Sequence, residues 1–351
     1  MLIFGSYRCL DTQLLHFYDP RSASEHQTIL RELNVLVAGM PAHFDQLCDV
    51  FCFWSVMFRR NSHFVAAARA QVSDVDPTVG AVPVNWNDGF KYWLHVGPEH
   101  KTETASTLLE ELEGYIADLE RFRAAATWVM AEHSTLQPTD FRGKAFKSYY
   151  AQHVVHVQIA INQIQFASCF YPSPIVWDNY IHVFQDIVDR APVLMPYLVQ
   201  KRSSSHDDQI SSFTFHFLIS ILIALATVVN LCRAQPIRDE ALALLARIYT
   251  EANDYKEGIC EIRIIYWLAK AIRDWEEIER DEAGYIPECE RLSFAEDLVV
   301  GPKIVVCKLW RGYGEGRTLV VREYEHHLQD EGFNGTAEYC VPEEYQIHLR
   351  S

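Results

Sequence analysis

Positive charge is scarce in this chain: 31 Lys and Arg residues stand against 47 Asp and Glu residues, a formal net charge of −16. A surface that acidic repels phosphate groups, so we expect no direct contact with nucleic acid. It also disfavours anionic membrane surfaces. The charge suits a protein of the nucleus or the cytoplasm, and the start of the sequence has no signal-peptide layout.

Motifs of covalent catalysis are missing as well. The sequence has no Gly-x-Ser-x-Gly, and no cysteine has an identifiable histidine partner. The glycine-rich stretch 312–316 lacks the following helix that a phosphate-binding loop needs. No solenoid-type repeat is present. The sequence therefore assigns no catalytic residue.

The nine cysteines have no zinc-binding spacing. Cys48 and Cys52 form a Cys-x3-Cys pair, which we interpret as one face of a helix. Cys52, Cys169 and Cys232 lie in apolar runs, where a buried and reduced thiol is expected. Cysteines used in this way indicate a reducing compartment.

Charge is also absent from one long run, Ser211 to Cys232, which is apolar on nearly every helical face. The run is long enough to span a bilayer, so a membrane span is one interpretation. His216 and Asn230 inside it, and Pro236 opening an amphipathic helix after it, favour a central helix buried by protein. No basic cluster marks a cytoplasmic flank.

Apolar residues recur at three- and four-residue steps over most of the remaining chain, which predicts helices. The predicted segments are 30–37, 44–60, 102–130, 139–170, 178–198 with interruptions near Pro192 and Pro196, 236–252 and 257–280. The pattern then becomes strand-like at 303–310 and 317–324, around a glycine-rich turn. We predict an all-α fold, a multi-helix bundle around the central apolar helix, with a small C-terminal β-hairpin.

These patterns predict that the chain is organised in three parts. Residues 1–101 form an N-terminal helical segment that ends in a loop-rich break at 73–101. Residues 102–300 form the helical core, and 301–351 the hairpin and tail. Within the core, His153 and His156 fall one helical turn apart. Two histidines alone do not make a metal site, so we expect a packed or hydrogen-bonded pair.

The order of features resembles the regulatory domain of fungal zinc binuclear cluster transcription factors. The quoted segments are Ser212-Phe-Thr-Phe-His216, the apolar helix, Cys232-Arg-x-x-Pro-Ile-Arg-x-Glu-Ala-Leu-Ala-Leu-Leu245, Glu257-Gly258 and Ser173-Pro-Ile-Val-Trp-Asp-Asn-Tyr180. The resemblance covers roughly 103–325. The six-cysteine DNA-binding cluster that opens such factors is absent.

The resemblance implies a regulatory, ligand-sensing domain without its own DNA-binding module, tied to a fungal metabolic gene cluster. Its partners would be another protein or a second copy of the chain, and a small apolar metabolite, with no cofactor. We expect the metabolite in an apolar pocket between the central helix and its neighbours, closed by Trp177, Tyr180, Phe213, Phe215 and His216.

The alternative is a lyase: a magnesium-dependent prenyl diphosphate (terpene) cyclase on the same helical scaffold. Asn253, Glu257 and Glu261 are spaced by four and would share one helix face, where they could hold Mg²⁺. This spacing is similar to the second metal motif of class I terpene cyclases, although Glu257 replaces the expected Ser or Thr. The Asp-Asp-x-x-Asp motif is missing, because Ser211 stands three residues after Asp208.

Overall fold

The fold is described from a computed structural model. It covers residues 21–74, 103–134, 144–168, 174–203, 221–252, 255–257, 260–282, 284–287, 291–299, 304–311, 320–327 and 333–340. The loop-rich break predicted at 73–101 lies almost entirely outside these residues. So do the first ten residues of the apolar run.

Helices make up most of the described chain, which confirms the all-α prediction. They are α2 (Ala23–Ala38), α3 (Leu47–Asp74), α5 (Glu103–Ser134), α6 (Lys144–Ser168), the 3₁₀ helix η1 (Pro174–Tyr180), α7 (Ile181–Ser203), α8 (Ile221–Leu231), α9 (Gln235–Glu251) and α10 (Ile262–Glu277). Pro236 stands in the first turn of α9, as predicted. Its missing N–H costs nothing there, because the first turn of a helix has no internal acceptor for it.

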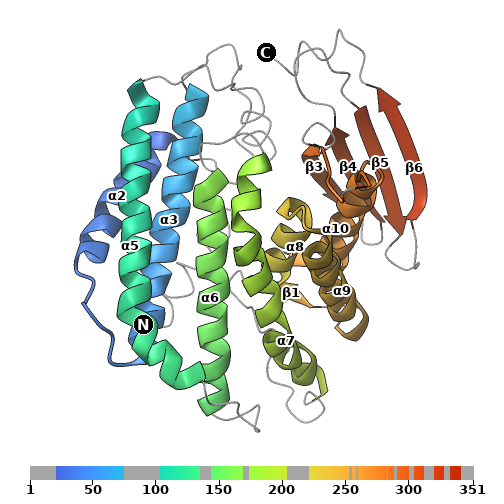
Figure 1. Cartoon of the computed structure of the whole chain (residues 1–351). Coiled ribbons are helices and arrows are strands. Elements are labelled where there is room, and N and C mark those ends of the chain that lie inside the picture. The colour runs from blue at the N-terminus through green and yellow to red at the C-terminus, as the bar shows by residue number, and fades with distance from the viewer. Residues whose placement is uncertain are drawn as a thin grey trace.

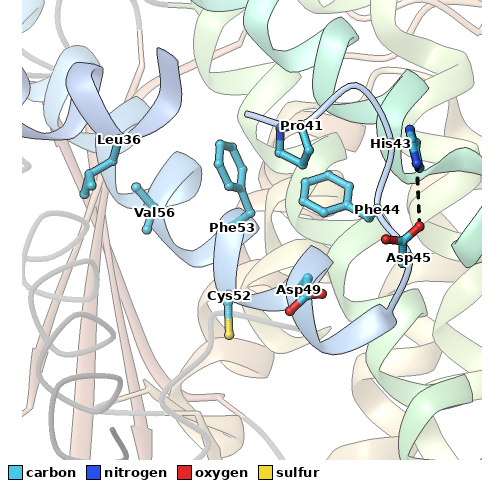
Figure 2. Close-up of a pocket in the computed structure, with 9 residues that line it drawn as sticks. All are labelled: Leu36, Pro41, His43, Phe44, Asp45, Asp49, Cys52, Phe53 and Val56. Carbon is cyan, nitrogen blue, oxygen red and sulfur yellow. Dashed lines mark ion pairs between the residues drawn. The ribbon is translucent and has the colours of Figure 1, made fainter. Parts of the chain in front are cut away.

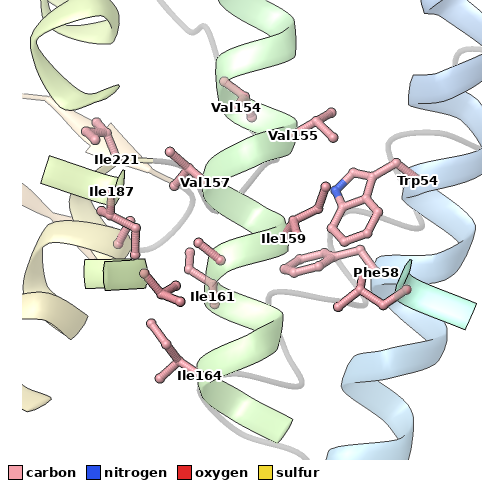
Figure 3. Close-up of a cluster of buried hydrophobic side chains, with 14 of the residues drawn as sticks. Trp54, Phe58, Val154, Val155, Val157, Ile159, Ile161, Ile164, Ile187 and Ile221 are labelled. Carbon is pink, nitrogen blue, oxygen red and sulfur yellow. The ribbon is translucent and has the colours of Figure 1, made fainter. Parts of the chain in front are cut away.

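Helix α6 joins the two sides of the bundle (Figure 1). It packs against α3 and α5 on one side and against α7 and α8 on the other. In Figure 3, Ile159 points toward Trp54 of α3, while Ile161 points toward Ile187 of α7. Apolar side chains therefore pack on both flanks of α6, and one continuous core runs through the helical body.

Buried polar pairs fix how α3 docks on its neighbours. The indole N–H of Trp54 donates to Oε1 of Gln158 on α6 at 2.6 Å. The Nδ1 atoms of His26 and His63 lie 3.0 Å apart, between α2 and α3. A polar group placed in an apolar interface is stable only where its partner stands, so these pairs select one register.

Helix α7 continues through both of its prolines, so the predicted interruptions near Pro192 and Pro196 were wrong. A proline inside a helix costs about 3 kcal/mol, because it removes one hydrogen bond and crowds the preceding turn. Ile187, Ala191 and Leu194 flank Pro192 and are fully buried, and the burial of this face offsets that cost.

The C-terminal segment is larger than the predicted hairpin. Four antiparallel strands lie in the order of the sequence: β3 (Leu292–Val299), β4 (Ile304–Arg311), β5 (Val320–His327) and β6 (Phe333–Cys340). The predicted hairpin is the β4–β5 pair, which joins Ile304 to His327 and Arg311 to Val320. Strands β3 and β6 had little strand signal of their own, so pairing with β4 and β5 makes them strands. The sheet contacts α10.

Helix α8 is enclosed by protein, as predicted for the apolar run. Ile221, Leu225 and Val229 have no exposed surface, and α8 contacts α6, α7, α9 and α10. Among the described residues, no helix combines the length and the hydropathy needed to cross a membrane. Neighbouring helices therefore bury the described half of the run.

Two arginines bind the carbonyl groups at the end of α8. Arg238 donates from Nε to the Val229 carbonyl at 2.6 Å. Arg291 donates from Nη2 to the carbonyls of Asn230 and Leu231, at 2.9 and 3.2 Å. The last carbonyls of a helix have no partner within it, and they carry the negative end of its dipole. Cationic donors satisfy both needs at once.

Carboxylates from α10 neutralise these arginines. Glu276, which is 1% exposed, lies 2.6 Å from Nη2 of Arg238 and 3.3 Å from Nε of Arg291. Glu277 adds a second contact to Arg238 at 3.3 Å. Burial lowers the pKa of Arg238, and the charge of Glu276 acts in the opposite direction. An arginine keeps its charge in proteins, so Glu276 compensates a buried cation.

A third arginine ties the start of α9 to η1. Arg233 donates from Nε to Oδ1 of Asp178 at 2.8 Å and from Nη1 to the hydroxyl of Tyr285 at 2.7 Å. Its guanidinium also stacks over the Tyr285 ring, 4.6 Å from the ring centre. We call Asp178, Arg233, Arg238, Glu276, Glu277 and Arg291 the arginine network. Arg280 links its two parts, because it donates from Nη2 to Glu277 at 2.6 Å and from Nη1 to the Arg233 carbonyl at 3.2 Å.

Glu276→Gln should destabilise the protein by about 3–5 kcal/mol, because it leaves two buried guanidinium groups without their shared counter-charge. Glu120→Gln is the matched control. It breaks an exposed pair with Arg123 and should cost at most about 1 kcal/mol. Urea unfolding of both variants measures the difference. Equal losses of stability would contradict the role given to Glu276.

Candidate functional site

An open groove lies between the end of α2, the loop 39–46 and the first turns of α3 (Figure 2). Its volume is about 530 Å³. The residues that line it are Leu36, Pro41, His43, Phe44, Asp45, Asp49, Cys52, Phe53 and Val56. The groove thus belongs to the N-terminal hundred residues, outside the part that carries the family resemblance.

The loop that forms one wall is held at both ends. At its start, the N–H of Gly39 donates to Leu36 and the N–H of Met40 donates to Val37, which ends α2 with two turns. Further along, the N–H of Phe44 donates to the carbonyl of Ala125 on α5 at 3.1 Å. These backbone bonds fix the wall without any side chain from inside the groove.

Aromatic packing makes the floor rigid. Phe44 packs edge-on against Phe122 of α5 and lies 5.7 Å from Phe53 of α3. Phe53 stacks on Phe122 at 6.4 Å, and Trp54 lies 5.2 Å from the same ring. Phe122 is fully buried, so the floor is an extension of the core. A floor anchored in this way exists before anything binds.

The rim is polar and acidic. The side chains of His43 and Asp45 are 80% and 85% exposed, with Nε2 and Oδ1 3.6 Å apart. At that distance and exposure the ion pair contributes little to stability. Asp49 lies in the first turn of α3, where the helix dipole favours an acid. Among the residues that line the groove, only His43 can carry a positive charge.

Cys52 opens into the groove, which corrects the prediction of a buried thiol. Helix α2 ends at Ala38, so it leaves the first turns of α3 uncovered on this side. Cys48 is exposed one turn earlier, so the pair does share a helical stretch of α3 as predicted. No hydrogen bond joins Cys52 to His43 among the described residues, so they lack the geometry of an activated thiol. Cys232 is buried as predicted, and burial raises the pKa of its thiol.

The predicted ligand-binding residues fall partly within the described chain. Trp177 is 7% exposed and belongs to the core, where its indole N–H has no acceptor among the described residues. Tyr180 is half-buried and packs against the same core. Phe213, Phe215 and His216 lie outside the described residues. The apolar pocket proposed for these five residues stays a prediction.

The helix face predicted for Asn253, Glu257 and Glu261 does not exist. Glu257 lies on the short strand β1 (Lys256–Glu257) and Glu261 on β2 (Cys260–Glu261), and the two strands pair in an antiparallel hairpin. Helix α10 begins only at Ile262, directly after the β1–β2 hairpin. Glu261 instead contacts Arg263 at 2.8 Å. Asn253 lies outside the described residues.

His153 and His156 of α6 form a packed site next to Arg190 of α7. Nη1 of Arg190 lies 3.3 Å from Nδ1 of His153, and the Tyr149 ring packs edge-on against His153 at 4.8 Å. Burial, and then the charge of Arg190, lowers the pKa of both histidines to about 4. Both rings are therefore neutral at pH 7.

Sequence reasoning missed the groove because its residues have no motif. Phe44 falls in the apolar pattern of the helix predicted at 44–60, and no pattern singled out Phe53 or the acids of the rim. The signal available was weak: a helix that ends near residue 38, then Pro41, then a second helix whose first turns carry both aromatic and acidic residues.

Acid should destabilise the protein through His153 and His156. The unfolded chain binds protons near pH 6.5 and the folded chain only near pH 4, so stability is full above about pH 7 and falls between pH 6.5 and 4. The double variant His153→Gln/His156→Gln should have a flatter profile in this window. Thermal unfolding from pH 8 to 5 measures it. The control His182→Gln removes an exposed ring and should keep the wild-type slope, and a double variant with that same slope would refute the assignment.

Comparison of the chain with protein-family models, with curated proteins and with solved structures finds no match. The resemblance to fungal regulatory domains therefore rests on the residues quoted from the sequence. Three of those residues, Asp178, Arg233 and Arg238, belong to the arginine network. Asp178 and Arg233 are 55 positions apart in the sequence, and their side chains are in contact.

Proposed function

We propose that this chain is a regulatory module that acts by binding, without a DNA-binding module of its own. The observation that carries the proposal is the preformed groove between α2 and α3. Its volume of about 530 Å³ lies within the usual range of ligand sites, roughly 300–1,000 Å³. Its floor is anchored in the core, and its rim offers charge for orientation.

The side chains of the groove support binding better than catalysis. The floor supplies apolar surface through Leu36, Phe53 and Val56, and the rim supplies carboxylates. No described contact pairs a nucleophile with a base there. Apolar contact with a few placed charges is what recognition requires, whereas group transfer requires a reactive pair within hydrogen-bond reach.

The resemblance supports the regulatory part of the proposal. A net charge of −16 works against direct binding to DNA, so regulation would proceed through another protein. In this proposal the small apolar metabolite would bind near Trp177 and Tyr180, which lie beside the arginine network. Asp178 stands between them in η1 and contacts Arg233, so a change there would reach the link between α8 and α9.

No observation favours the alternative of a prenyl diphosphate cyclase. The spacing of Glu257 and Glu261 suggested it, and these residues lie on a hairpin instead of a helix face. No group of three or more potential metal ligands occurs among the described residues.

Leu36→Glu should weaken the binding of Nile red, a neutral dye that fluoresces in apolar sites, by about tenfold, because it places a charge in the groove. The matched control is Ile116→Glu, which makes the same change at an exposed apolar position of α5 outside the groove. Dye titration followed by fluorescence measures both affinities. Identical affinities for wild type and Leu36→Glu would show that the groove is not a binding site.

A further inference from the structure

We infer that the occupant of the groove is an amphipathic helix of a partner protein with basic residues beside its apolar stripe. This inference rests on the proposed function, because it names the partner class of the same site. The shape of the groove and the charge of its rim support the inference independently of each other.

The floor of the groove has the shape of a helix-binding surface. Four residues that line it lie along one face of α3, because they are spaced by three, one and three positions: Asp49, Cys52, Phe53 and Val56. Seven residues of helix span about 10 Å, or two turns. An apolar stripe at every third and fourth residue of a partner helix would match that length. In Figure 2, Pro41 and Phe44 of the loop lie beside Phe53 of this face.

Large apolar side chains are exposed on α2 and α5. Val35 and Leu36 at the end of α2 are 73% and 49% exposed, although both are large and apolar. Trp128 of α5 is 70% exposed. It stands three residues after Ala125, which binds the loop at Phe44, and residues three apart on a helix are neighbours. Tryptophan is enriched among the residues that dominate protein interfaces.

The charge of the rim selects a basic partner. Asp45 and Asp49 are both exposed at the edge of the apolar floor, and the whole chain carries a charge of −16. Opposite charge on the partner speeds association and fixes its orientation, whereas an acidic partner would be repelled. Lys and Arg suit this edge, because their long stems cover apolar surface while their charge reaches the aspartates.

Two 16-residue designed peptides test the inference. Both carry leucine at positions i, i+3, i+4 and i+7, and their flanks are lysine in one and glutamate in the other. Fluorescence anisotropy should show that the lysine peptide binds the full chain at least tenfold more tightly than the glutamate peptide at low salt. Asp45→Asn/Asp49→Asn should lose about tenfold in affinity for the lysine peptide, and 0.5 M salt should remove the difference.

Controls separate the groove from general attraction to an acidic protein. Glu110→Gln/Glu113→Gln removes the same two charges from exposed positions of α5 and should bind the lysine peptide like wild type. Bound lysine peptide should also protect Cys52 from N-ethylmaleimide, with Cys48 as the internal reference, since both thiols are exposed and only Cys52 lines the groove. Peptide mass mapping reads both sites.

The outcomes distinguish the two proposals. If Nile red binds the groove and neither peptide does, the helical partner is refuted and the binding function stands. Equal binding of both peptides, or equal losses in the two double variants, would refute the basic partner. If neither the dye nor the peptides respond to Leu36→Glu, the proposed function fails as well.

Discussion

The carbonyl groups at the end of α8 find their donors inside the protein, because the helix that carries them packs against four other helices. Arg238 and Arg291 supply these donors, and their own charges then require Glu276. Each step follows from the cost of burying a polar group without a partner. These contacts fix the positions of the elements around α8. Helix α10 supplies the carboxylates and the start of α9 supplies Arg238. Arg233 contacts η1 through Asp178.

Helix α6 holds the two sides of the helical body together, as the arginine network holds together the elements around the end of α8. It presents apolar side chains to both flanks, and so it connects the N-terminal helices with α7 and α8. Apolar packing alone would allow several registers between α3 and α6. The hydrogen bond between Trp54 and Gln158 selects one of them. The neutral histidines beside Arg190 are a further consequence, because a ring held in this packed layer loses the water that would favour its charged form.

The groove results from a mismatch in helix length. Helix α2 ends at Ala38 before it covers the first turns of α3, and the loop that follows is pinned to α5 at Ala125. Phe53, which is half-buried and stacks on the buried ring of Phe122, thereby lines the groove, and Asp45 and Asp49 lie at its edge. A binding site of this kind needs no catalytic motif. It requires an apolar floor that stays in place and a rim whose charge discriminates between partners, and both are properties of the packing.

The helical fold, the burial of the described half of the apolar run and the position of Pro236 could be predicted from the sequence. They depend on local periodicity and on a stretch without charged residues, which is unfavourable in water. The outer strands β3 and β6, and the continuity of α7 through Pro192, could not, because pairing and packing with distant segments outweigh local propensity there. Glu257 and Glu261 show the same limit: a spacing of four places two residues together only if the chain is helical between them. The exposure of Cys52 and the existence of the groove were decided by the tertiary structure alone, since they depend on where a neighbouring helix ends.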